Sequence, residues 1–74
     1  MSSADKLVMM ANQIGRFFVP QGGPDPAAAI ADHLQKFWEP RMRKAIAAHL
    51  AAGGAGLEGP VREAVGRLKE AKAS

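Results

Sequence analysis

Three groups of residues in this sequence have types and spacing that could do chemistry. The first is GAGLEG, from Gly54 to Gly59, which has the G-x-G-x-x-G spacing of dinucleotide-binding loops. Such a loop binds pyrophosphate when a strand precedes it, a helix follows it and an acidic residue lies about 20 positions further on. The residues before GAGLEG have helical periodicity, and the sequence offers no acidic residue at that distance. We therefore interpret GAGLEG as the end of a helix followed by a turn.

The second group is the pair of histidines, His33 and His49. A catalytic histidine needs a nucleophile or substrate within hydrogen-bond reach and a further group that orients its ring. The sequence contains no cysteine or tyrosine, and its hydroxyl groups belong to Ser2, Ser3 and Ser74. Two histidines are also too few for a metal site unless several carboxylates converge on them. We expect both histidines to be packed, hydrogen-bonded helix residues.

The seven acidic residues are scattered, and none is paired at a spacing that suggests acid–base catalysis. Asp25, directly before Pro26, is predicted to cap a helix. Asp32 with Lys36, and Glu63 with Arg67, have the four-residue spacing of ion pairs on a helix surface. The sequence therefore predicts no catalytic, cofactor-binding or metal-binding residue in this chain.

Length and composition limit the possible folds and classes of function. A chain of 74 residues makes one domain at most, and such a chain buries only about 60% of the surface that its unfolded form exposes. The absence of cysteine excludes disulfides and thiolate zinc sites. The net charge of +3 is spread along the chain, which is weak evidence for nucleic-acid binding. No apolar run is long enough to span a bilayer, and MSSADK lacks the features of a secretory signal, so we expect a cytoplasmic protein.

The elements that must position these residues are helices. Apolar residues recur at three- and four-residue spacing, whereas alternating apolar and polar runs are missing. Proline and glycine divide the pattern, because Pro26, Pro40 and Pro60 favour first helical positions and glycine favours helix ends. The sequence predicts an all-α fold, a small bundle of four short helices at about 4–19, 26–38, 40–52 and 60–71, in a single domain over residues 1–74.

The third group is KFWEPRMRK, from Lys36 to Lys44, which contains the only tryptophan. A tryptophan in a free-standing helical domain is more often core than interface. Interfaces, however, favour tryptophan, phenylalanine, methionine and arginine, and this stretch contains all four. Four short helices cannot cover every large aromatic side chain here, so we expect a partner to dock at the corner between the second and third helices. The predicted partner-binding residues are Phe37, Trp38, Pro40, Arg41, Met42 and Arg43.

Three segments also resemble a known family. They are MANQI followed by Phe17 and Phe18, then H-L-x-x-F-W-E-P-R-M from His33 to Met42, then AAGGAGL from Ala51 to Leu57. Together they resemble the delta subunit of the cytoplasmic NAD-dependent formate dehydrogenases.

The resemblance implies a non-catalytic accessory subunit that acts in assembly or stabilisation. In that family a large alpha subunit holds a bis-pterin molybdenum or tungsten centre and iron–sulfur clusters, and formate is oxidised to carbon dioxide there. Beta and gamma subunits pass the electrons through FMN to NAD. The implied partner is the large alpha subunit, with beta and gamma in the same complex, and the implied chain holds no cofactor and binds neither nucleic acid nor membrane.

Other hypotheses remain open on the sequence alone. A small helical nucleic-acid-binding protein would use the basic face of the third helix, with Arg41, Arg43 and Lys44 contacting phosphates. A stand-alone homo-oligomer would instead cover the exposed apolar surface with a second copy. An enzyme in its own right ranks last, because reactive side chains are scarce.

Overall fold

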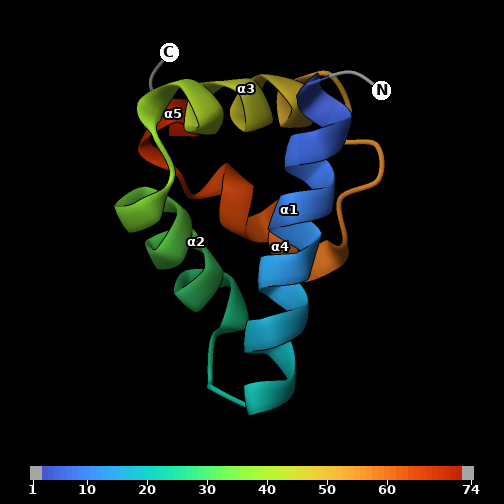
Figure 1. Ribbon diagram of the computed structural model, residues 1–74. Helices are drawn as coiled ribbons and strands as arrows, with labels where there is room; N and C mark the ends of the chain where they lie inside the picture. Colours follow the sequence, from blue (N-terminus) through green and yellow to red (C-terminus); the bar gives the residue numbers. More distant parts are fainter. Residues whose placement is uncertain (1–2, 73–74) are drawn as a thin grey trace.

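The turns of this fold lie where the sequence places proline and glycine (Figure 1). The structure is a computed structural model that describes residues 3–72. The all-α prediction with four principal helices is confirmed, since residues 3–72 contain no strand. A bilayer-spanning helix is also absent from this range, because none is both long and apolar enough. The elements are α1 (Ser3–Phe18), the 3-10 helix η1 (Val19–Gln21), α2 (Pro26–Phe37), α3 (Pro40–Ala51), α4 (Gly59–Gly66) and α5 (Lys69–Lys72).

Proline and its preceding residue define where helices begin. The Asp25 carboxylate accepts a hydrogen bond from the Ala28 backbone N–H at 3.2 Å, which confirms the predicted cap of α2. Glu39 is extended, with φ −67° and ψ 153°, as expected for a residue that precedes proline. Pro40 then occupies the first turn of α3, where its missing N–H has no consequence for the helix.

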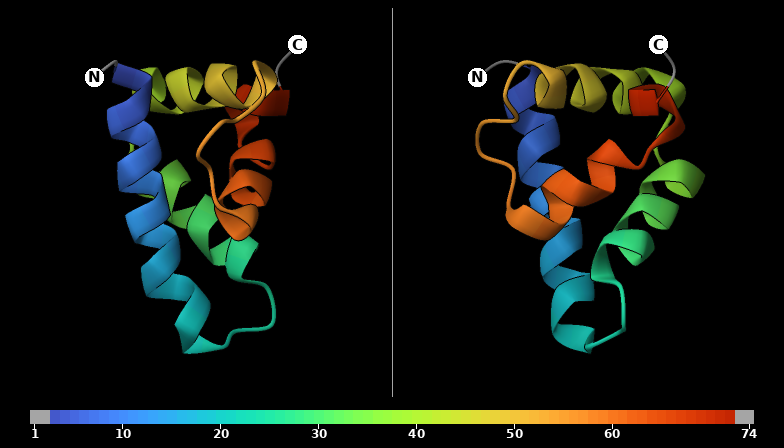
Figure 2. Two further views of the ribbon diagram at one scale, coloured as in Figure 1. Left: turned by 90° about the vertical axis from the view of Figure 1, so that its right-hand side faces the viewer. Right: turned by 180° about the vertical axis from the view of Figure 1, so that it is seen from behind.

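The helices enclose a core between α1, α2 and α4. In Figures 1 and 2, α1 and α2 diverge from the loop that joins them, and α4 fills the space between them. Helix α3 lies across the open end, packed against α1, α4 and α5. The buried core residues are Val8, Ala11, Ala27, Ile30, Leu34, Trp38, Ile46, Leu57, Val61, Ala64, Val65 and Leu68.

Gly15 allows α1 to approach α4 closely. A Cβ atom at this position would lie 2.4 Å from Cγ2 of Val61, which is itself buried. Only glycine fits this helix crossing without a shift of one helix or of the Val61 side chain. The crossing brings the core side chains of α4 into contact with α1 and α2.

The last predicted helix, 60–71, is divided in the structure. Helix α4 ends at Gly66, a turn follows, and α5 begins at Lys69. Glycine is a poor helix former, and the turn places Leu68 in the core with 1% of its surface exposed. It also brings Glu70 of α5 within 3.0 Å of Arg43 of α3. Tertiary contacts therefore override the local helical pattern here.

Candidate docking surface

Four aromatic rings from α1 and α2 meet on the surface. We call them the aromatic cluster: Phe17, Phe18, His33 and Phe37. The ring centroids are 5.1 Å apart for Phe17 and Phe18, 5.7 Å for Phe18 and His33, and 4.8 Å for His33 and Phe37. Phe17 is 65% exposed and Phe37 is 72% exposed, so the outer rings of the row face solvent.

Helical geometry explains why part of this row is exposed. Phe17 and Phe18 are adjacent on α1, and neighbouring positions on a helix do not share a face. Phe18 packs against the core, which leaves Phe17 outside. His33 and Phe37 lie one turn apart on α2, so their rings stack along its surface. A hollow lined by Met10, Gln13 and Ile14 of α1 adjoins the cluster.

The sequence analysis expected some aromatic side chains to stay uncovered, but it did not name Phe17 among the predicted partner-binding residues. The adjacent pair was itself the signal, since a single face cannot bury both rings. Exposed aromatic side chains that gather on one face of a small protein indicate an interaction site. The arrangement of these rings therefore suits binding to another protein surface.

Trp38 requires a correction, because the structure places it in the core rather than on the surface. Its side chain is 6% exposed and belongs to the buried cluster. Its backbone N–H donates to the Leu34 carbonyl oxygen at 3.0 Å, and its own backbone is extended. The chain leaves α2 at this point, which turns the indole inward while Phe37, one residue earlier, points out. Trp38 is therefore not available to a partner in this conformation.

Arg43 requires a second correction, because its guanidinium is occupied inside the molecule. Nε donates to Glu70 Oε1 at 3.0 Å, and Nη1 donates to the backbone carbonyl oxygens of Gln35 and Trp38. The Arg43 side chain is 12% exposed. Burial alone raises the pKa of the Glu70 carboxyl, but hydrogen bonds from its own N–H and from Arg43, with the charges of Arg43 and Lys69, lower that pKa overall. Arg43 thus ties α5 to the α2–α3 corner.

The other residues of the predicted corner have mixed positions. Phe37, Pro40 and Arg41 are exposed, and Met42 is half-buried against the core. Arg41 and Met42 line a groove between α3 and the first half of α1. The structure therefore joins Phe37 to the aromatic cluster and joins Arg41 and Met42 to the groove. With Arg43 turned inward, the basic face proposed for nucleic-acid binding loses one of its three cations.

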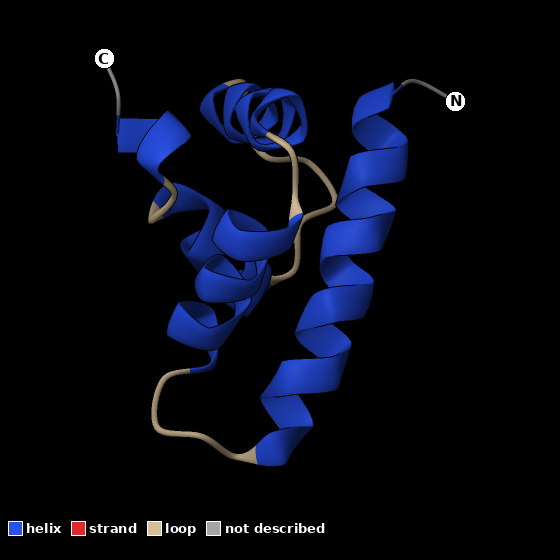
Figure 3. Ribbon diagram, turned by 60° about the vertical axis from the view of Figure 1, so that its left-hand side comes forward, coloured by secondary structure: helices blue, strands red, loops and turns tan. Residues whose placement is uncertain are grey.

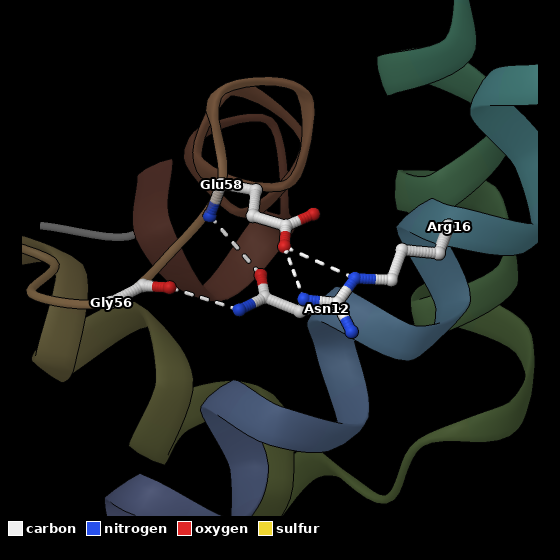
Figure 4. Close-up of polar contacts among 4 residues, drawn as sticks. All are labelled: Asn12, Arg16, Gly56 and Glu58. Carbon is white, nitrogen blue, oxygen red and sulfur yellow. Dashed lines mark hydrogen bonds and ion pairs between the residues drawn. The ribbon is translucent and has the colours of Figure 1, made fainter.

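The GAGLEG loop is held to α1 by Asn12 and Arg16 (Figure 4). Asn12 Nδ2 donates to the Gly56 carbonyl oxygen at 2.9 Å, and Asn12 Oδ1 accepts from the Glu58 backbone N–H at 3.1 Å. Arg16 binds the Glu58 carboxylate through Nη2 at 2.7 Å and through Nε at 3.1 Å. One turn of α1 therefore fixes both the backbone and the acidic side chain of this loop.

The carbonyl groups of Gly53, Gly54 and Ala55 also accept hydrogen bonds from side chains. Arg62 Nη2 donates to the carbonyl oxygens of Gly53 and Gly54 at 3.0 and 3.1 Å. His49 Nε2 lies 2.8 Å from the Ala55 carbonyl oxygen, which accepts the hydrogen bond. Gly53 and Gly54 have positive φ angles of 124° and 67°, as a helix end followed by a turn requires. The prediction of a helix end and turn for GAGLEG is confirmed, as is the hydrogen-bonded role of His49.

Comparison with known protein families decides which class of protein carries this surface. The sequence profile of the NADH-dependent formate dehydrogenase delta subunit family, FdsD, matches residues 6–65. The chain belongs to this family. As a delta subunit, it is a component of a multi-subunit NAD-dependent formate dehydrogenase. The matched range contains the whole aromatic cluster and the GAGLEG loop. The comparisons of this chain with curated proteins and with solved structures found no match.

The delta subunit sequence does not contain the usual ligand of iron–sulfur clusters. Iron–sulfur clusters are held by cysteine thiolates, and this sequence has no cysteine. Within the described residues, no three His, Asp or Glu side chains gather in a group that could hold a metal ion. Its ionic contacts are structural: Arg67 at the end of α4 pairs with Asp25 at the start of α2 at 2.8 Å, whereas Asp32–Lys36 and Glu63–Arg67 each join residues one helical turn apart. The two predicted helix-surface pairs are confirmed.

Proposed function

We propose that this delta subunit is a non-catalytic accessory component that docks through the aromatic cluster on the large metal-containing subunit of formate dehydrogenase. The carrying observation is the exposure of Phe17 and Phe37, which stand at the two ends of the row of contacting rings. The docked subunit stabilises the complex or assists its assembly. In this proposal the complex is cytoplasmic, and its bis-pterin molybdenum or tungsten centre, iron–sulfur clusters and FMN belong to the other subunits.

The size of the exposed aromatic surface supports its role as a docking site. Full burial of a phenylalanine side chain is worth about 1.5–3 kcal/mol. Phe17 and Phe37 retain 65% and 72% of their exposure, so covering both rings would contribute roughly 2–4 kcal/mol. Phe18 and His33 pack against these rings and restrict their motion. A partner therefore gains apolar contact while ordering few side chains on this surface.

The residue inventory supports an accessory role over a catalytic one. The hydroxyl-bearing side chains of the sequence are Ser2, Ser3 and Ser74, and the sequence has no cysteine or tyrosine. The His49 ring is engaged with the GAGLEG loop, and the His33 ring lies in the aromatic cluster. Among residues 3–72, neither histidine has a hydrogen bond to a hydroxyl group. The chemistry of formate oxidation is therefore assigned to the other subunits.

The accessory role is tested with formate dehydrogenase purified from cells that lack the delta subunit gene. Metal content and NAD reduction by formate are measured before and after addition of purified delta subunit. We expect equal turnover per loaded metal centre, with a lower yield or a shorter lifetime of the intact complex when the delta subunit is missing. The proposal is overturned if fully loaded, fully assembled complex turns over only after the delta subunit is added.

A further inference from the structure

A groove between α1 and α3 forms a second surface, distinct from the aromatic cluster. Its floor is apolar, and its rim carries two cations, Lys6 from α1 and Arg41 from α3. Both rim residues are exposed. The apolar floor consists of Leu7, Met10, Met42 and Ala45.

The rim cations have no ion-pair partner among residues 3–72, which is also true of Lys44, Arg62 and Lys69. Arg16, Lys36, Arg43 and Arg67 each pair with a carboxylate within 3.1 Å, whereas Lys6 and Arg41 form no such pair with any described residue. Glu39, two positions before Arg41, is exposed and forms no ion pair with it. The groove therefore presents two cations that pair with no carboxylate of residues 3–72.

Met10 connects this groove to the aromatic cluster. It lines the groove on one side and the hollow beside Phe17, Phe18 and His33 on the other. Met10 is 41% exposed, so the connection is open to solvent. Helix α1 runs the length of the molecule along one side (Figure 3), and residues of α1 line both hollows. We call the two hollows, which share Met10, the strip: Lys6 and Arg41 lie at one end and the aromatic cluster lies at the other.

We infer that this strip accepts a partner polypeptide segment that carries carboxylates at one end and large apolar side chains along the rest. The carboxylates lie beside Lys6 and Arg41, and the apolar side chains extend over Met10 to Phe17. The inference rests on the proposed function, since it places the segment in a subunit of the same complex. A second copy of this chain is a poor occupant, because it brings the same two cations and a net charge of +3.

An apolar floor also distinguishes this groove from a nucleic-acid site. Phosphate contacts need several accessible cations along a strand, and Arg43 of α3 is bound internally. Methionine side chains adapt to the shape of apolar partners, and Met10 and Met42 lie in the groove. A protein segment can provide carboxylates for the cations and apolar side chains for the methionines.

The test compares Arg41→Glu with Lys44→Glu, because both reverse one cation on α3 and only Arg41 lines the groove. The binding of each variant to formate dehydrogenase purified without its delta subunit is measured over a series of salt concentrations. We expect Arg41→Glu to bind about ten-fold more weakly than the unmodified chain, with a shallower salt dependence. Lys44→Glu is expected to change the affinity much less. Equal affinities for the two variants overturn the inference.

A Phe17→Ser/Phe37→Ser variant separates this inference from the proposed function. If it loses binding while Arg41→Glu does not, docking at the aromatic cluster stands and the acidic segment is ruled out. If neither variant loses binding, both proposals fail. Light scattering of the isolated chain provides a third outcome: a dimer that Arg41→Glu dissociates would identify the occupant as a second copy and overturn the inference. Melting temperatures of all variants establish that each one is folded.

Discussion

The imidazole of His33 lies against the ring of Phe37, one turn further along α2, with centroids 4.8 Å apart and planes tilted by 40°. Phe18 contacts the same imidazole from α1. His33 therefore links a ring packed on the core to a ring exposed to solvent. This contact holds Phe37 in place on the surface before any partner arrives, and such pre-organisation lowers the entropic cost of binding.

Replacing His33 should therefore weaken docking more than folding. Aromatic contacts of this kind are worth about 0.5–1.5 kcal/mol beyond buried area, so we expect His33→Ala to weaken binding by about 2- to 10-fold. Titration of the delta-free complex with the variant measures this effect. His49→Ala is the matched control, because it loses the hydrogen bond to Ala55 and should lower the melting temperature while binding stays the same. The role of His33 in docking would be contradicted if His49→Ala weakened binding and His33→Ala lowered only the melting temperature.

Phe37 and Trp38 should respond very differently to truncation. Trp38→Ala removes a core side chain and is expected to cost about 3–5 kcal/mol of unfolding free energy. Phe37→Ala removes an exposed ring and should change that free energy by about 0.5 kcal/mol or less. Urea denaturation followed by far-UV circular dichroism measures both values. Iodide quenching of Trp38 in the unmodified chain should be weak, and strong quenching would show that the indole faces solvent.

The contact of Gly15 with Val61 predicts a cost for a single added methyl group. Gly15→Ala places a Cβ atom 2.4 Å from Val61 Cγ2, and overpacking of this kind costs about 1–3 kcal/mol. Gly66→Ala is the control, because its Cβ would meet Leu50 at an ordinary 3.7 Å. Chemical denaturation should show a loss for Gly15→Ala alone. If Val61→Ala does not reduce the cost of Gly15→Ala in a double-mutant cycle, the close contact is not its cause.

The ion pair between Asp25 and Arg67 predicts how stability depends on pH. The hydrogen bond from Arg67, followed by that from the Ala28 N–H, lowers the pKa of Asp25 below its ordinary value of 3.8. A carboxyl whose pKa is lower in the folded state stabilises the fold above its unfolded pKa, and this stabilisation disappears as the pH falls through the folded pKa.

Asp25→Asn should therefore lower the melting temperature at about pH 6, and this effect should shrink toward about pH 2 as the pH falls through the lowered pKa of Asp25. Asparagine still caps a helix, so the difference between the two pH values reports the loss of charge. Asp32→Asn is the control, since it removes a carboxylate from an exposed pair with Lys36 that contributes little to stability. An Asp25→Asn effect of equal size at both pH values would rule out the ionic contribution.

The sequence was informative where local chemistry decides the structure. Proline after Asp25 and after Glu39 marks the first turns of α2 and α3. Helical periodicity identified the all-α fold, and the spacing of Asp32 and Lys36 predicted their ion pair. These features depend on residues within one helical turn of each other.

The sequence was less informative where distant segments meet. Arg43 is removed from the surface by Glu70, 27 positions away, and the turn at Leu68 makes that contact possible. The residue at which α2 ends determines whether Phe37 or Trp38 points inward, because adjacent side chains point in different directions. Periodicity does not fix a helix end to one residue. The prediction of partner-binding residues therefore included Trp38 and Arg43, whose side chains are largely buried in the structure.

The most direct test of the docking account is the affinity of Phe17→Ser/Phe37→Ser for formate dehydrogenase that lacks its delta subunit, measured by biolayer interferometry. Met9→Ser is the control, because Met9 is an exposed apolar residue of α1 outside the cluster. The account predicts a loss of affinity of about 30-fold or more for the double variant, from the roughly 2–4 kcal/mol of aromatic burial, with a melting temperature close to that of the unmodified chain. Unchanged affinity of a folded double variant would contradict it.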